Sequence, residues 1–207
     1  MLDNEPAYHT VDKVIAELGA NKRKWVVSSV DANTGNYYLM NETLPRDEHA
    51  RAFVASTLIP AVFPHDNWGN AVLMDGGTVW NTNLVSAVQR CREQVDDDSQ
   101  ITLDIIVCGY PKIDTTWEFK DETIENFLRY KDIKDFYSHS EDIAGFIKAF
   151  PKVNFRYFLA PSQPLAGGLA ILDFNNATST WPMQMIGRTD GENAIKAGPG
   201  FMFNKIN

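Results

Sequence analysis

The chain has 207 residues, a formal net charge of −8 and a pI of about 4.9, and it is 44% hydrophobic and 22% charged. Such a chain can form one globular domain with a sizeable core. Because it is acidic and has no basic run, we expect no nucleic-acid partner and at most peripheral contact with a membrane. No stretch reaches the roughly 18 apolar residues that span a bilayer, and residues 1–10 lack a signal-peptide core, which predicts a cytoplasmic protein.

Cysteine and histidine usage predicts neither a disulfide framework nor a metal site. Cys91 and Cys108 have no zinc-ligand spacing, and we expect both to be buried, reduced thiols. The four histidines lie far apart, and the run Asp96–Asp98 lacks the spacing of a calcium loop, so it predicts a solvated loop. We therefore expect no metal and no cofactor.

The first third of the chain predicts a helix followed by a β-hairpin and a second helix. Apolar residues recur at helical spacing from Tyr8 to Leu18, and Gly19 follows as a stop. Residues 24–30 and 37–40 read as strands joined by the turn 31–36. A helical pattern then covers 45–56, with acidic residues in its first turn.

The middle of the chain predicts a βαβ unit. The apolar run Val72–Met74 ends in Asp75 and is followed by Gly76 and Gly77. A helical stripe then runs from Leu84 to Val95, and 101–108 reads as a strong strand. This order predicts an α/β fold with a mostly parallel sheet and helices on both faces.

The last third is less regular. We expect helices over 124–136 and 143–150, strands over 155–159 and 169–174, and turns from Gly187 onward. The aromatic residues Phe127, Tyr130, Phe136 and Tyr137 are expected in the core. No repeat or linker divides the chain, so residues 1–207 are predicted to form one domain.

Three short signatures resemble the second half of the patatin-like phospholipase domain. The segment 54–64 contains Ala55-Ser56 with Pro60 and Phe63-Pro64, the Asp75-Gly76-Gly77 box follows, and Asn81 stands four residues after the second glycine. The resemblance is good over about 25–109 and weaker over 111–207. It implies a three-layer αβα fold that is incomplete on its N-terminal side.

The resemblance also implies an activity and a site. The family hydrolyses acyl lipids with a Ser–Asp dyad, which makes Asp75 the catalytic carboxylate, Gly76 and Gly77 the shapers of its turn, and Asn81 a motif residue. The substrate is then a phospholipid or a related acyl lipid.

The nucleophile of that dyad is not in this sequence. The chain contains no Gly-x-Ser-x-Gly and no Gly-x-Gly-x-x-Gly, both of which lie upstream of residue 1 on the family plan, and Asn83 stands where the family commonly has proline. The chain is therefore expected to be either a fragment or truncated form of a hydrolase or a degenerate paralogue.

Other interpretations of these residues remain. A degenerate chain would serve as a non-catalytic scaffold that binds lipid or a protein partner, and an unrelated protein would use Asp75 as a plain turn residue. Ser56 lacks the flanking glycines of a nucleophile and is expected to pack at a helix end. His65 is expected in a surface loop rather than in a pocket. The oligomeric state is left open.

Overall fold

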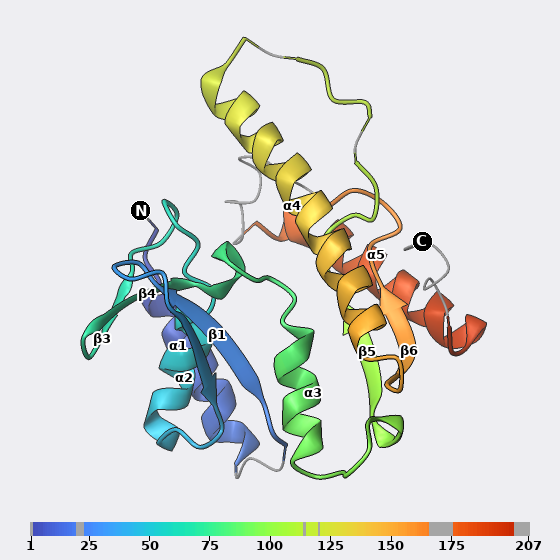
Figure 1. Ribbon diagram of the computed structural model, residues 1–207. Helices are drawn as coiled ribbons and strands as arrows, with labels where there is room; N and C mark the ends of the chain where they lie inside the picture. The colour runs from blue at the N-terminus through green and yellow to red at the C-terminus, as the bar shows by residue number, and fades with distance from the viewer. Residues whose placement is uncertain (1, 20–22, 114, 120, 166–175, 201–207) are drawn as a thin grey trace. The chain divides into compact units, whose positions relative to one another are not determined.

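The computed structural model describes residues 2–19, 23–113, 115–119, 121–165 and 176–200. The chain divides into two compact units, residues 1–91 and 92–207, whose elements are labelled in Figure 1. Both units contain helices and strands, so the mixed α/β class is confirmed. That the two units form one domain stays a prediction.

The first unit is built on a four-stranded antiparallel sheet in the order β2-β1-β4-β3. Strands β1 and β2 form the predicted hairpin, in which Val26 pairs with Asn41 and Val30 pairs with Tyr37. Gly35 takes a φ of 73° in its turn, and Gly69 takes a φ of 61° between β3 and β4. The elements of this unit are α1 (Glu5–Leu18), β1 (Val26–Asp31), β2 (Tyr37–Asn41), the 3₁₀ turn η1 (Arg46–Glu48), α2 (His49–Ala55), β3 (Asp66–Trp68), β4 (Ala71–Asp75), the 3₁₀ turn η2 (Gly76–Thr78) and α3 (Leu84–Arg92).

The expectation of a mostly parallel sheet is wrong for this unit. The predicted βαβ unit would pair β4 with the strand after α3, but β4 pairs antiparallel with β1 and β3. The short strand β3, for which we predicted no strand, supplies one of these partners. Apolar runs of four or five residues look alike in parallel and antiparallel sheets, so the sequence pattern did not separate the two cases.

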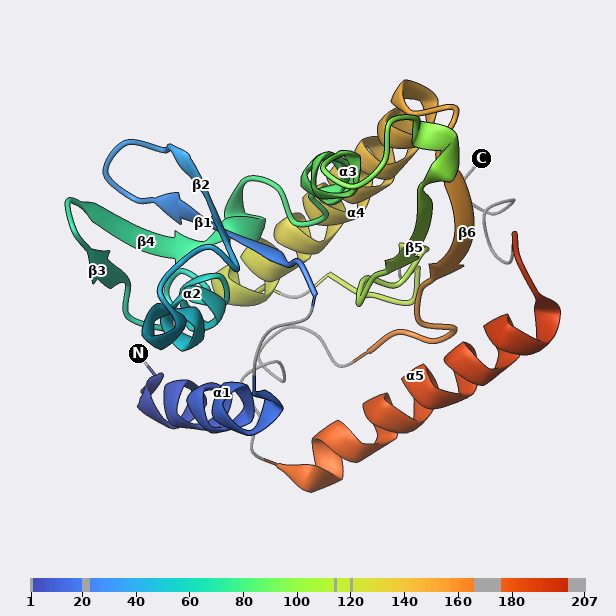
Figure 2. The same ribbon diagram turned by 90° about the horizontal axis from the view of Figure 1, so that it is seen from below.

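One face of this sheet is covered by helix α2, and helix α1 packs on α2 (Figure 2). Small residues on α2 let the helix approach the sheet closely. Helix α1 has no buried residue, although its amphipathic pattern was predicted correctly. The core between α2 and the sheet contains Met40, Ala52, Ala55, Ala71 and Leu73, with Trp25, Val27, Leu44 and Trp68 packed against it.

The second unit contains a two-stranded parallel sheet. Thr102 pairs with Asn154 at one end and Ile106 with Leu159 at the other. Its buried side chains include Ile105, Phe146 and Phe158. The elements of this unit are the 3₁₀ turn η3 (Asp98–Gln100), β5 (Thr102–Ile106), α4 (Thr123–Ala149), β6 (Asn154–Leu159) and α5 (Ala177–Ala197).

Several expectations for the second unit need correction. The two helices predicted over 124–136 and 143–150 form the single 27-residue helix α4 (Figure 1). Helix α5 runs through Pro182 and past Gly187, where we expected turns. The strand predicted at 169–174 lies outside the described residues.

Two predictions of burial are also wrong. Cys108 is exposed in the loop after β5, and Cys91 is only half-buried, and both are free thiols. In α4, Phe127, Tyr130 and Tyr137 are more than half exposed, because the buried residues of this helix, Ile143 and Phe146, lie in its C-terminal part.

Among the described residues, no helix is long and apolar enough to cross a membrane.

Candidate functional site

Asp75 is the last residue of β4 and is fixed by the chain on both sides. Its backbone N–H donates to the carbonyl oxygen of Leu58 over 3.0 Å. Its carboxylate Oδ1 accepts a hydrogen bond of 2.7 Å from the N–H of Gly77. Through this bond Asp75 is the N-cap of the short turn η2. Asp75 is half-buried, so the structure places a hydrogen-bonded carboxylate at the end of a strand, where solvent still reaches it.

Both glycines after Asp75 are crowded, Gly76 by the backbone of Ser28 and Gly77 by the side chains of Asn81 and Asp75. A Cβ on Gly76 would lie 2.4 Å from both the carbonyl oxygen and the Oγ of Ser28. A Cβ on Gly77 would lie 2.7 Å from the Oδ1 of Asn81 and 3.1 Å from the Oδ1 of Asp75. Neither glycine has a positive φ, so close approach rather than backbone conformation accounts for both.

The four residues expected at the site, Asp75, Gly76, Gly77 and Asn81, lie together around this turn. The side-chain oxygens of Asp75 and Asn81 both lie beside Gly77. Asn83, which stands where the resembled family has proline, instead caps helix α3. Its Oδ1 accepts from the N–H of Ser86 over 3.0 Å, and its Nδ2 donates to the Ser86 hydroxyl over 2.7 Å.

Tyr37 joins the hairpin to the loop after the turn, and we did not single it out from the sequence. Its hydroxyl lies 2.7 Å from the Oγ of Ser28 and 3.1 Å from the carbonyl oxygen of Trp80. Because a carbonyl only accepts, the Tyr37 hydroxyl donates to Trp80 when Ser28 donates to Tyr37. The predicted hairpin could have indicated this contact, because its register makes Ser28 and Tyr37 diagonal neighbours on one face.

Asp31 ties the same hairpin to the start of β4. Its side chain is buried, and its oxygens accept from the Thr34 hydroxyl (2.6 Å), the Val72 N–H (2.9 Å) and the Asn33 N–H (3.2 Å). The hydrogen bonds from Thr34 and then Val72 hold the pKa of the Asp31 carboxyl below its ordinary value. The ionised Asp31 carboxylate therefore joins the turn of the hairpin to strand β4 by hydrogen bonds.

The other candidate residues, Ser56 and His65, do not contribute to the site around Asp75. The Ser56 hydroxyl donates to the carbonyl oxygen of Phe53 over 2.8 Å at the end of α2, as expected for packing at a helix end. His65 is exposed in the loop before β3. Within the described part of the chain, no three His, Cys, Asp or Glu residues gather as a metal site would require.

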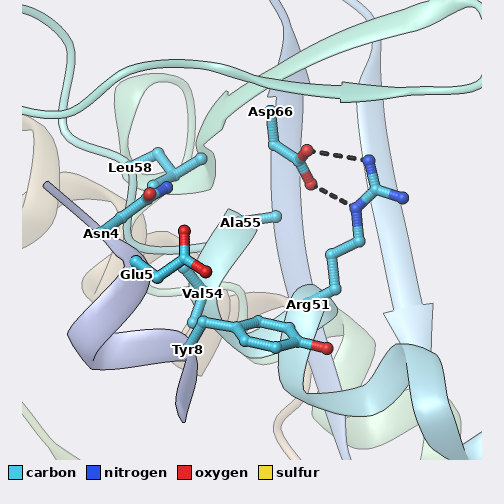
Figure 3. A pocket seen from close by; sticks show the side chains of 8 residues that line it. All are labelled: Asn4, Glu5, Tyr8, Arg51, Val54, Ala55, Leu58 and Asp66. Atoms are coloured by element: carbon cyan, nitrogen blue, oxygen red, sulfur yellow. Dashed lines mark hydrogen bonds and ion pairs between the residues drawn. The ribbon is translucent and has the colours of Figure 1, made fainter.

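A cavity of about 300 Å³ opens between helix α1, helix α2 and the segments next to them (Figure 3). On one wall, Arg51 donates to Asp66 through Nε (2.7 Å) and Nη2 (2.8 Å), which raises the pKa of Arg51. Leu58 links the cavity to the site, because its carbonyl oxygen holds the Asp75 N–H. The lining residues are Asn4, Glu5, Tyr8, Arg51, Val54, Ala55, Leu58 and Asp66.

This arrangement can present one oriented carboxylate to a group above the turn. A carboxylate held by a backbone N–H can accept a proton from a hydroxyl placed within about 3 Å of it. Neither a protein-family model nor a curated protein matches the chain.

Proposed function

We propose that this chain belongs to a patatin-like lipid acyl hydrolase and carries the aspartate of its Ser–Asp dyad. The observation that carries the proposal is the geometry at Asp75. A carboxylate at a strand end is oriented by the Gly77 N–H and is followed by two glycines, the first of which has the Ser28 backbone where a Cβ would lie. The substrate is an acyl ester of a phospholipid or a related lipid, and the protein acts in the cytoplasm.

The proposed reaction is acyl transfer to a serine. The Asp75 carboxylate takes the proton of the serine hydroxyl, and the serine oxygen attacks the ester carbonyl. Backbone N–H groups stabilise the oxyanion, and its collapse expels the alcohol, which takes the proton held by Asp75. Water then hydrolyses the acyl-enzyme, which releases the fatty acid and the free serine. The serine would come from a Gly-x-Ser-x-Gly turn, which these 207 residues do not contain.

The proposal includes the three-layer αβα architecture of that family. In the first unit, one face of the sheet already has α2 and α1 on it. In the complete hydrolase, further strands and helices that carry the serine would extend this sheet and cover its other face.

The decisive experiment replaces Asp75 by Asn in the product of the whole reading frame that encodes this chain. Removal of a general base should lower the rate of phospholipid or p-nitrophenyl ester hydrolysis by about 10²–10⁴-fold. Asp96→Asn is the matched control, because it makes the same change at an exposed carboxylate of the other unit. Full activity in Asp75→Asn, with Asp96→Asn unchanged, would show that Asp75 is not the base.

A second candidate is a non-catalytic scaffold that binds lipid or a protein partner. The missing serine turn favours it. A fluorophosphonate probe labels only activated serines, so labelling of the 207-residue chain would refute this candidate. Absence of labelling, together with co-sedimentation with phosphatidylcholine vesicles, would support it.

A further inference from the structure

Ser29 has a buried hydroxyl that no hydrogen bond accounts for. The residue lies in β1 and has no exposed surface. Its Oγ has no hydrogen-bond partner within the described ranges. Burying a hydroxyl without a partner costs free energy, so such a group calls for a specific explanation.

The register of the sheet places Ser29 directly opposite Asp75. In the antiparallel pair of β1 and β4, Ser29 is the residue that faces Asp75, one position before the Val30–Met74 pair. Residues opposite each other in such a pair have their side chains on the same face, with Cβ atoms about 4.5–5.5 Å apart. A rotation about one side-chain bond of Ser29 can therefore bring its hydroxyl to the Asp75 carboxylate.

The other groups near Ser29 are less suitable acceptors. Asp31 lies two residues along the same face, but its two oxygens already accept three hydrogen bonds. Tyr38, which pairs with Ser29 on β2, is exposed. Among the titratable groups of α2 and the segment next to it, His49 contacts the Leu44 carbonyl, and Arg51 is paired with Asp66. Asp75 accepts from the Gly77 N–H, and because a carboxylate offers about four lone-pair sites it can accept a further donor.

We propose that Ser29 is a positioning residue whose hydroxyl donates a hydrogen bond to the Asp75 carboxylate. Together with the Gly77 N–H, this bond would fix the orientation of the carboxylate and favour its ionised form. The hydrogen bond itself concerns only Ser29 and Asp75, whereas its value to catalysis rests on the proposed function.

The test is an NMR titration of the aspartate carboxyl carbons in the 207-residue chain. Ser29→Ala should move the titration midpoint of Asp75 upward by about 0.5–1 pH unit, a three- to tenfold change in proton affinity. Ser29→Thr, which keeps the hydroxyl, should restore the midpoint. Ser56→Ala, which removes a hydroxyl bonded elsewhere, should leave it unchanged.

A second measurement needs no variant. In the unaltered chain, the Ser29 Cβ shift should change with pH at the same midpoint as the Asp75 carboxyl carbon. A flat Ser29 shift, or an unchanged Asp75 midpoint in folded Ser29→Ala, would overturn the proposal. Neither readout depends on activity, so this failure is distinct from a failure of Asp75→Asn to abolish hydrolysis.

Discussion

The tightest packing around the site is at Gly76. A methyl group at this position would be driven into the Ser28 carbonyl oxygen, which belongs to the backbone of β1 and cannot turn away. The Ser28 hydroxyl can rotate, but it is already joined to Tyr37. A larger residue at position 76 must therefore displace the turn η2 from β1.

Replacement of Gly76 by Ala should destabilise the protein by about 1–3 kcal/mol, the usual range for overpacking. Gly145→Ala is the control, because nothing lies within 4 Å of its added methyl group in α4. That substitution should be neutral or stabilising by up to about 1 kcal/mol, since alanine favours helix. Urea unfolding followed by circular dichroism measures both, and equal effects would contradict the crowding at Gly76.

Asp31 should make the stability of the protein sensitive to acid. Its pKa is lowered in the folded chain, chiefly by Thr34 and then by Val72. A carboxyl with a lowered folded pKa stabilises the fold fully above its unfolded pKa, and this contribution is lost as the pH falls through the folded pKa. The affected window therefore begins near the ordinary value of 3.8 and extends below it.

Thermal unfolding between pH 2 and pH 6 tests this expectation. Asp31→Asn should lower the melting temperature at pH 6, and the gap between variant and parent should close toward pH 2. Asp96→Asn, at an exposed carboxylate, should leave the curve nearly unchanged. A gap of constant size across the range would show that the charge of Asp31 does not stabilise the fold.

At the scale of the element, helix α4 is anchored at one end. Near its C-terminus, the centroid of the Phe146 ring lies 4.5 Å from that of Phe150 and 5.8 Å from that of Phe155 on β6. Near its N-terminus, Ile124, Phe127 and Tyr130 are all more than half exposed. Packing therefore stabilises the last turns of this helix far more than the first.

Phe146→Ala should cost about 3–5 kcal/mol of stability, because it empties a buried site. Phe127→Ala removes the same side chain from an exposed position of the same helix and should change stability by no more than about 0.5 kcal/mol. Chemical denaturation of the two variants makes the comparison. Similar losses would show that the N-terminal half of α4 is packed as well.

Local signals predicted most elements of the fold. The hairpin β1–β2 followed from alternation and a turn, and α1, α3, β5 and β6 followed from periodicity. The merged helix α4 was missed because its central residues 138–142 are polar and interrupt the apolar stripe. Helix α5 was missed because Pro182 and Gly187 are typical of helix ends. In both cases the helix continues through residues that usually end one.

At the scale of the whole molecule, strand pairing was the part that sequence did not supply. Which strand lies beside β4 depends on contacts between residues far apart in the chain, such as Ser29 with Asp75, and no local pattern encodes them. The site was partly foreseen. Asp75, Gly76, Gly77 and Asn81 do lie around one turn, whereas Tyr37, Ser28 and Ser29 enter it only through the antiparallel register.

The crowding at Gly76 also has an evolutionary consequence. Every substitution there adds at least one carbon atom where the Ser28 backbone already lies. Natural selection would thus retain glycine at this position even in a descendant that had lost all catalytic activity, because folding alone demands it. We infer no such steric constraint at Asp75. Substitution of Asp75, rather than of Gly76, would therefore mark the lineages that no longer use the site.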